Sequence, residues 1–338
     1  MNITLDHKQL YPLTFHPLYM ERLWGGSMMS EVLGRQLPES DQPIGEAWEL
    51  VDRDGEESVV SNGVLAGATL SELVKYYRGA LLGSDGVRFE RFPLLVKLID
   101  AGERLSLQVH PDEIACRKIG NGAEPKTEMW YVIAAKPGAE ILAGLNSRAT
   151  QVQLRDSLEF PEKLESFLQT YKSMPGDAYY IASGTLHAIG AGNLILEIQQ
   201  NSDTTYRIND WGRLGPDGKP RQLHKEAGLQ AINFTNRTSP RIAGAVGEKS
   251  FNRKFDVVKI CPFFQVSDLR LRSAWNDSTL PGNSFHLLSA VKNSVKIGRD
   301  DLTCVIHPGE TALVPACFGA YTVTPLEEGS ATVIKTTL

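Results

Sequence analysis

Cysteine is scarce in this sequence. The 338 residues contain four cysteines: Cys116, Cys261, Cys304 and Cys317. No two of them form a Cys-x-x-Cys pair, so their spacing supports neither a disulfide framework nor a zinc site built on thiolates. Free cysteine is often buried as a small apolar residue, and we expect that role for all four.

Long apolar runs are also missing. No segment approaches the roughly 20 apolar residues that a membrane-spanning helix needs. The segment from Met1 to Pro17 has no apolar core of the kind that marks a signal peptide. We therefore expect a protein of the reducing cytoplasm that does not enter a membrane.

Positive charge is not in excess, because the formal net charge is −5. This balance argues against a general nucleic-acid-binding protein. It does not exclude a small anionic substrate, since a few local Lys or Arg side chains can hold a phosphate. No glycine-rich loop lies between a predicted strand and a predicted helix, which disfavours the Rossmann and P-loop classes.

Glycine and proline are plentiful, with 30 and 18 residues, and they separate many short strand-like segments. Apolar residues at helical spacing predict only three helices, at 69–82, 161–171 and 224–232. The clearest predicted strands are Pro93 to Ile99, Leu105 to Val109, Met129 to Ala134, Ala178 to Ala182, Leu194 to Gln199 and Phe263 to Leu271. Short strands between Gly and Pro predict a mainly β fold of the jelly-roll barrel kind with a few helices.

The length of the chain favours two domains. The polar segment from Asn236 to Lys254 is typical of a linker, and strand-like sequence resumes after it. We predict a first domain at 1–240, with short helical insertions, and a second β domain at 241–338.

Two segments carry side chains suited to a metal site. In the strand that ends in Gln108-Val109-His110, the glutamine and the histidine point the same way because alternate residues share a face. The same argument places Lys126 and Glu128 on one face of the segment that follows Pro125. Burying both would be costly without partners, which a metal and an anionic substrate would supply. The alternative is an exposed ion pair at the edge of a sheet.

A third segment contains Gly176, Gly184 and His187 at a spacing that resembles the second cupin motif. Ala182 stands where that motif usually has proline. The first cupin motif is also matched: Gly102 precedes Gln108-Val109-His110 at the expected distance, with glutamine in the first histidine position. The resemblance implies a metal held by Gln108, His110, Glu128 and His187. Two imidazoles, a carboxylate and an amide suit Zn²⁺ or another divalent first-row metal.

The order Gln-x-His-Pro, Lys-x-Glu, Gly-Thr-x-His and Ser-Asp-x-x-x-Arg resembles the class I mannose-6-phosphate isomerases, in their short bacterial form. The matching stretches run through nearly all of residues 20–213. The resemblance implies a reversible aldose–ketose isomerisation of mannose 6-phosphate and fructose 6-phosphate, in which a proton moves between C1 and C2. It also implies catalytic roles for Lys126, Asp203 and Arg207.

The chemistry of these side chains fits that reaction. Lys126 and Arg207 can stabilise the negative charge of an enediolate. Arginine stays protonated in proteins, so we assign Arg207 to charge stabilisation or phosphate contact. Asp203 and a water on the metal are alternative proton carriers. Trp24 and Trp48 are candidates for lining the sugar pocket, and aromatic core packing is the alternative for both.

The C-terminal segment from Pro308 to Ala320 resembles the second cupin motif in part. Gly309 and Pro315 fit it, but Cys317 occupies the glycine position and Ala320 the ligand position. We predict a degenerate second barrel that has lost its metal site and has a structural or dimer-forming role. His286 and His307 are expected to be surface or packing residues.

Two other functions remain open at this level. The first is another cupin enzyme, such as an iron-dependent oxygenase or an isomerase of a different sugar phosphate, which would leave Lys126, Asp203 and Arg207 unexplained. The second is a non-catalytic sugar-phosphate sensor, which the complete ligand set and the lack of an effector segment disfavour. The sequence does not distinguish a monomer from a homodimer.

Overall fold

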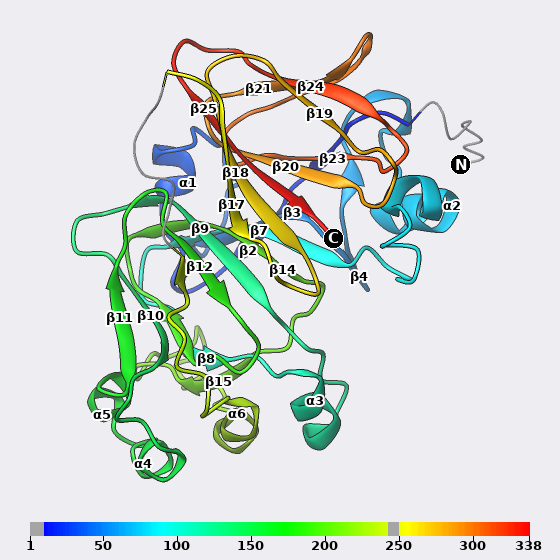
Figure 1. Ribbon diagram of the computed structural model, residues 1–338. Coiled ribbons are helices and arrows are strands. Elements are labelled where there is room, and N and C mark those ends of the chain that lie inside the picture. Colours follow the sequence, from blue (N-terminus) through cyan, green and yellow to red (C-terminus); the bar gives the residue numbers. More distant parts are fainter. Residues whose placement is uncertain (1–9, 243–249) are drawn as a thin grey trace. The chain divides into compact units, whose positions relative to one another are not determined.

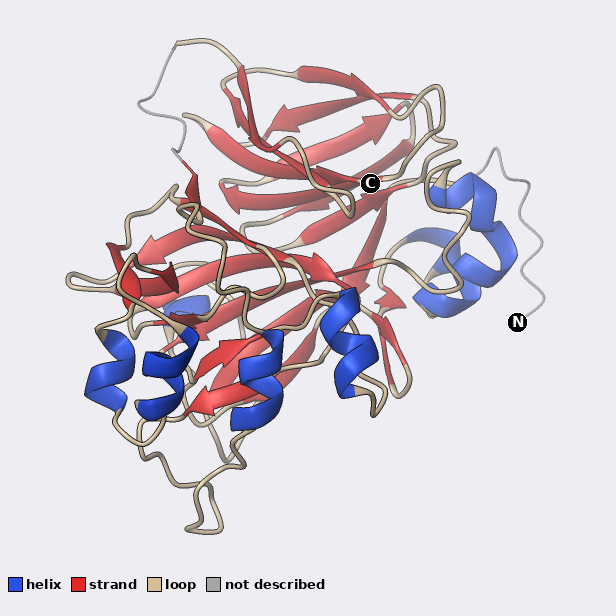
Figure 2. Cartoon of the chain, turned by 60° about the horizontal axis from the view of Figure 1, so that its bottom comes forward, coloured by secondary structure: helices blue, strands red, loops and turns tan. Residues whose placement is uncertain are grey.

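The computed structural model describes residues 10–242 and 250–338, and strands dominate it (Figures 1 and 2). The described residues form two compact units that are discontinuous in sequence. One consists of 10–18, 48–97 and 250–338, and the other of 19–47 and 98–242. The predicted domains, 1–240 and 241–338, are continuous, and that division stays a prediction. Part of the predicted linker, 243–249, lies outside the described residues.

The unit that contains residues 98–242 is built on two antiparallel sheets. The strand order is β16-β12-β9-β14-β7-β3-β2 in the seven-stranded sheet and β11-β10-β13-β8-β15 in the five-stranded sheet. The larger sheet comprises β2 (Leu18–Glu21), β3 (Ile44–Leu50), β7 (Leu94–Ala101), β9 (Glu128–Ala135), β12 (Ala178–Ile181), β14 (Asn193–Gln200) and β16 (Arg241–Ile242). The smaller sheet comprises β8 (Leu107–Val109), β10 (Glu140–Leu145), β11 (Leu168–Lys172), β13 (His187–Ile189) and β15 (Tyr206–Asn209).

Apolar side chains from both sheets meet in one core. Trp130 and Val132 of β9 pack in the same cluster as Ile141 of β10 and Ile189 of β13, and all four are buried. Alternate residues of each strand therefore face the partner sheet, as in a jelly roll. The predicted mainly β architecture is confirmed.

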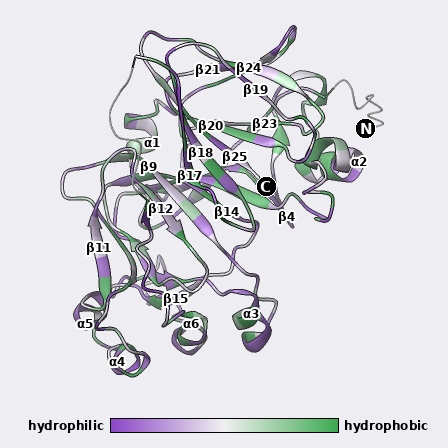
Figure 3. Ribbon diagram, viewed as in Figure 1, coloured by the Kyte–Doolittle hydropathy of each residue, from purple (hydrophilic) through white to green (hydrophobic). Residues whose placement is uncertain are grey.

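Short helices cover the other face of the five-stranded sheet. Leu107 and Val109 of β8 belong to a second apolar cluster together with Leu154, Leu164 and Leu229 of three helices. The three helices are α4 (Gln151–Asp156), α5 (Pro161–Glu165) and α6 (Lys225–Ala231). A fourth helix, α3 (Glu113–Ile119), contributes Ala115 to the same cluster. Of the described helices in the unit, the remaining one, α1 (Met28–Glu31), is not part of this cluster. In Figure 3 both α3 and α6 carry hydrophobic and hydrophilic residues. Because Leu107 and Val109 face the helices, the residue between them faces the space between the sheets.

The other unit also contains two larger sheets, with strand orders β17-β18-β25-β20-β23-β1-β6 and β19-β24-β21-β22, and the two-stranded sheet β4-β5. Its N-terminal elements are β1 (Leu13–His16), β4 (Asp52–Arg53), β5 (Glu56–Glu57), β6 (Val59–Val60), the 3₁₀ helix η2 (Gly63–Leu65) and α2 (Leu70–Leu82). Its C-terminal strands are β17 (Arg253–Val258), β18 (Gln265–Leu271), β19 (Trp275–Ser278), β20 (His286–Lys292), β21 (Val295–Arg299), β22 (Leu302–Ile306), β23 (Thr311–Val314), β24 (Ala320–Pro325) and β25 (Ala331–Thr337). Their apolar side chains share one core, so this unit is a second β sandwich.

Two histidines of this second sandwich, His286 and His307, are hydrogen-bonded to hydroxyl groups. His286 is buried, and its Nδ1 lies 2.6 Å from the Tyr321 hydroxyl. His307 Nδ1 lies 3.0 Å from Ser294 Oγ. Ala320, at the ligand position of the partial motif, begins β24 and is exposed. Among the described residues, one group of three or more His, Cys, Asp or Glu side chains is close enough together to hold a metal ion, and it lies in the other unit.

The helix predictions had mixed outcomes. The helix at 69–82 is present as α2, with the Thr69–Glu72 capping box, and that at 224–232 is present as α6. The helix at 161–171 was wrong beyond residue 165, because Leu168–Lys172 forms β11 and pairs with β10. The short helices α3 and α4 were missed, although Asp112 and Thr150 cap their N-termini. None of the described helices has the length and apolarity that crossing a membrane requires.

Candidate metal centre

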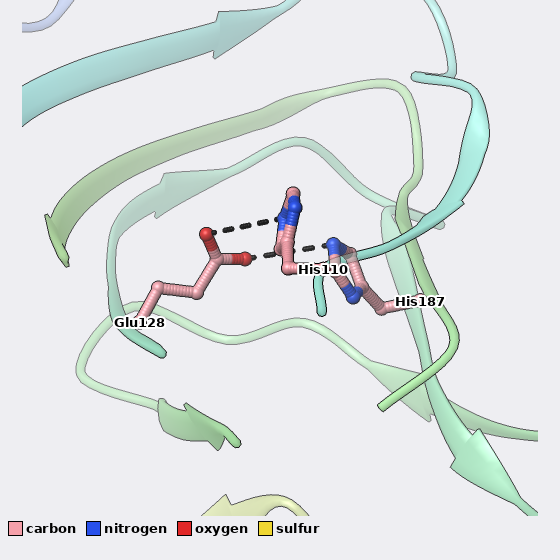
Figure 4. A group of neighbouring side chains, drawn as sticks. All are labelled: His110, Glu128 and His187. Carbon is pink, nitrogen blue, oxygen red and sulfur yellow. Dashed lines mark ion pairs between the residues drawn. The ribbon is translucent and has the colours of Figure 1, made fainter. Parts of the chain in front are cut away.

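Three buried side chains converge between the two sheets of the 98–242 unit (Figure 4). Glu128 begins β9 in the larger sheet, His187 begins β13 in the smaller one, and His110 directly follows β8. The Nε2 atom of His110 lies 3.5 Å from Glu128 Oε2, and the Nε2 atom of His187 lies 3.5 Å from Glu128 Oε1. The ligand atoms all lie within 4.8 Å of one another, and none of the three side chains is more than 1% exposed.

Backbone carbonyls hold both imidazoles in the orientation that a metal needs. His110 Nδ1 lies 2.9 Å from the Thr204 carbonyl oxygen, and His187 Nδ1 lies 2.8 Å from that of Thr185. A carbonyl can only accept, so each Nδ1 carries the hydrogen and donates it. Each Nε2 therefore presents its lone pair toward Glu128, which is the arrangement of metal-binding histidines.

The electrostatics of the cluster favour the ligating protonation states. Burial, together with the nearby Lys126 ammonium, lowers the pKa of His110 to about 4. Burial also lowers the pKa of His187. Burial alone would raise the pKa of Glu128, but Lys126 and His110 hold it well below its usual value. At neutral pH the cluster thus has two neutral imidazoles and one carboxylate, the forms that bind a metal.

The cluster also has polar atoms that the rest of the described chain leaves unsatisfied. The Nε2 atoms of both histidines and Oε1 of Glu128 are buried and have no hydrogen-bond partner among the described residues. Such atoms are costly to bury. A divalent cation between them would satisfy all three, and the two nitrogens and one carboxylate suit Zn²⁺ or another first-row metal. The residues present therefore fit the metal that the sequence implies.

Gln108 lies next to this cluster in the β ladder. It is directly opposite His187 of β13 on one side and Arg207 of β15 on the other. Directly opposed residues of antiparallel strands share a face, so Gln108 projects from the same face of the sheet as His187. Its role as a fourth ligand stays a prediction that this placement supports.

Lys126 is part of the buried cluster. Its Nζ lies 2.9 Å from Glu128 Oε2 and 3.7 Å from Glu197 Oε1, and the side chain is 5% exposed. The alternative of an exposed ion pair at a sheet edge is therefore wrong. The ammonium lies where it can contact a negatively charged group in the interior.

Glu197 was not recognised from the sequence. It lies on β14 opposite Trp130, whose indole Nε1 donates a hydrogen bond of 2.8 Å to Glu197 Oε2. Its side chain is buried beside Lys126. A charged residue within the apolar run Leu194-Ile195-Leu196-Glu197-Ile198 was the signal available, because burial of such a residue requires a partner.

Arg207 lies on β15 and is held from one side by the segment that follows. Its backbone N–H donates to His224 Nδ1 at 3.2 Å, and its Nη1 donates to the Gln222 carbonyl oxygen at 2.9 Å. Burial lowers the pKa of Arg207, and Arg221 lowers it further. The guanidinium still carries its charge at neutral pH, as arginine does in proteins.

Three other candidate residues are not part of the cluster. Asp203 is exposed. Trp24 is buried in the apolar core between the sheets, in the same cluster as Trp130. Trp48 is buried on β3, where Lys97 Nζ of the neighbouring strand β7 lies 5.6 Å from its ring. The substrate-binding roles of both tryptophans stay predictions.

Known proteins share both the sequence and the fold of this chain. Residues 13–128 match the model of the phosphomannose isomerase type I catalytic domain. The chain is 42% identical over 310 residues to the mannose-6-phosphate isomerase ManA of Bacillus subtilis, which covers 92% of this chain and 95% of that protein. It is 38% identical over 223 residues to the mannose-6-phosphate isomerase of Streptococcus mutans, with 66% and 68% covered.

A solved structure agrees with these relatives. The crystal structure of the mannose 6-phosphate isomerase from Bacillus subtilis matches with a TM-score of 0.85 and 31% identity, and the match covers 97% of this chain and 100% of that one. The family resemblance and the cupin-type fold class inferred from the motifs are thereby confirmed. The chain belongs to the type I phosphomannose isomerases.

Proposed function

We propose that this protein interconverts mannose 6-phosphate and fructose 6-phosphate at the cluster of His110, Glu128 and His187. The observation that carries the proposal is the convergence of three buried, unpartnered ligand atoms beside the Lys126 ammonium. Membership of the isomerase family supplies the reaction. A protein that only binds the sugar phosphate would not need a buried ammonium group in contact with a set of metal ligands, as Lys126 is with Glu128.

The residues that would hold the metal are Gln108, His110, Glu128 and His187, and we propose Zn²⁺ as the ion, one per chain. When bound, the ion supplies Lewis-acid stabilisation to the sugar oxygens at C1 and C2. Lys126 and the carbonyls of Thr185 and Thr204 hold the ligand side chains in place.

The charged side chains would act on the charge that develops during isomerisation. Moving a proton between C1 and C2 passes through an enediolate, which carries negative charge. Lys126 would stabilise that charge from the interior, where a low dielectric strengthens the interaction. Arg207 would stabilise it, or contact the phosphate, from the face that it shares with Gln108.

Two carboxylates outside the ligand set can carry the proton. Asp203 is the residue implied by the family resemblance, but its side chain is exposed. Glu197 is buried, with Oε1 3.7 Å from Lys126 Nζ. The geometry favours Glu197 for proton transfer or for orienting Lys126, because it already lies among the charged groups of the site.

We further propose a cytoplasmic enzyme that acts as a monomer or homodimer on a free sugar phosphate, without nucleic acid or membrane as a partner. The degenerate second sandwich would have a structural or dimer-forming role.

The proposal is tested by following the metal-loaded protein with mannose 6-phosphate by NMR, together with an oxygen electrode. We expect fructose 6-phosphate as the product and no oxygen uptake. Oxygen uptake or a different product would indicate another cupin enzyme. Unchanged sugar, with metal content confirmed and ligand binding detected by thermal shift, would indicate a sensor.

A further inference from the structure

The chain after β15 folds back along the strand that carries Arg207. An isolated antiparallel β-bridge between Leu214 and Pro220 brings the two ends of the loop between them together. The returning segment then pairs with β15, because the His224 N–H donates to the Arg207 carbonyl oxygen at 2.7 Å. Arg207 N–H donates back to His224 Nδ1 at 3.2 Å. Both backbone groups of Arg207 are therefore bound to the returning segment.

A bidentate ion pair between Asp210 and Arg221 joins the end of β15 to the segment that returns after the loop. Arg221 Nε lies 2.7 Å from Asp210 Oδ2, and Arg221 Nη2 lies 2.6 Å from Asp210 Oδ1. The Asp210 side chain is 5% exposed, and Arg213 Nη1 lies 3.8 Å from its Oδ1. Bidentate pairs of this kind fix geometry as well as contributing energy.

The bidentate pair lies next in sequence to Gln222, the residue whose carbonyl oxygen accepts a hydrogen bond from the Arg207 guanidinium. Gln222 follows Arg221 directly, and its carbonyl oxygen accepts the 2.9 Å hydrogen bond from Arg207 Nη1. We infer that Asp210 and Arg221 form a latch that positions Arg207 for catalysis by fixing the Gln222 carbonyl. The inference rests on the role proposed above for Arg207.

Charge in the latch has a second consequence for Arg207. In addition to burial, Arg221 and Arg213 lower the pKa of Arg207, because they carry the same charge and destabilise its charged form. Asp210 has the opposite charge and raises that pKa. Glu103 Oε2 lies 3.6 Å from Arg213 Nε and also balances its charge. Asp210 is the carboxylate that pairs with Arg221, so its loss should leave the repulsion between Arg221 and Arg207 uncompensated.

The test uses Arg221→Lys, which keeps the charge but loses the bidentate pair, and Asp210→Asn, which keeps the shape but loses the charge. We expect kcat to fall about 100-fold in each, the scale of a small misplacement of a catalytic group, with KM little changed. Metal content should equal that of the unmodified protein. The matched control is Arg241→Lys, because Arg241 Nη2 lies 2.8 Å from Asp177 Oδ1 in the same unit but contacts no candidate catalytic residue; its kcat should not change.

A double-mutant cycle separates positioning from general loss of structure. In an Arg207→Lys background, Arg221→Lys should lower kcat little further, because the residue that it positions is already altered. A full additional loss there, or a loss in the control variant of the same size, would overturn the latch. If Arg207→Lys is inactive while Arg221→Lys and Asp210→Asn are both normal, the latch fails and the role of Arg207 stands. Normal turnover in Arg207→Lys and Arg207→Ala would overturn both.

Discussion

The buried ammonium of Lys126 offers a sharp test of how charge is balanced in the metal cluster. Lys126→Met keeps an unbranched side chain of similar length and removes the charge. Lys126 Nζ lies 2.9 Å from Glu128 Oε2 and 3.7 Å from Glu197 Oε1, and both carboxylates are buried. The variant would therefore retain two buried carboxylates and lose the cation that lies between them.

The loss of stability in Lys126→Met should depend on whether a metal ion is bound. Removing one partner of a buried ion pair costs roughly 3–5 kcal/mol, because a charge is left uncompensated. For a domain of this size that lowers the melting temperature by on the order of 10 °C. With a divalent cation bound, Glu128 keeps a positive neighbour and the loss should be smaller. Metal should thus stabilise Lys126→Met more than it stabilises the unmodified protein.

The assay is thermal unfolding of both proteins, with chelator and with excess Zn²⁺. Lys136→Met is the control: the Lys136 side chain is 54% exposed and its Nζ lies 3.7 Å from Glu31 Oε2, and such surface pairs contribute about 0–1 kcal/mol. If metal-free Lys126→Met unfolds at the temperature of the unmodified protein, the ion pair does not compensate the buried carboxylates and the reasoning is refuted.

Three further predictions concern other parts of the same unit. His187→Ala removes a buried ligand, so it should release the metal and abolish turnover; metal analysis that finds full occupancy would remove His187 from the site. Arg207→Ala should leave metal content intact and lower kcat by about 100-fold or more, and near-normal rates would contradict its assignment. Burial raises the pKa of Asp100 from 3.8 to about 6, so the folded protein binds more protons in that interval and loses stability as pH rises through it. Asp100→Asn does not titrate, so urea unfolding should show its stability relative to the unmodified protein increasing between pH 4 and pH 6; parallel curves would contradict the shift.

Local patterns in the sequence were enough to predict six of the strands, namely β7, β8, β9, β12, β14 and β18. The segments predicted around β7, β9 and β14 are strands in the structure, because their apolar residues fill a core between two sheets. The discontinuous units were not predictable in the same way. Leu13 of β1 pairs with Leu313 of β23, and no local pattern specifies a partner so distant in sequence. The strand β11 was misjudged for a related reason, since its pairing with β10 outweighs a helical spacing of apolar residues.

The candidate site was predictable where two polar residues stand two apart in the sequence at the end or the start of a strand. Gln108 with His110, and Lys126 with Glu128, show that spacing, and the structure brings His110, Lys126 and Glu128 together with His187. Asp203 was selected from the family resemblance and is exposed in the structure, whereas buried Glu197 was missed although it interrupts an apolar run. The carbonyls that orient the imidazoles come from loops, and only the folded chain shows them.

The central claim is that a metal held by His110, Glu128 and His187 supports mannose 6-phosphate isomerisation. The most direct measurement is a coupled assay that converts mannose 6-phosphate to fructose 6-phosphate, run before chelation, after it, and after Zn²⁺ is added back. We expect activity that is lost with the metal and restored with it. Undiminished activity in protein shown to be metal-free would contradict the role of the cluster, and no activity in fully metal-loaded protein would contradict the reaction itself.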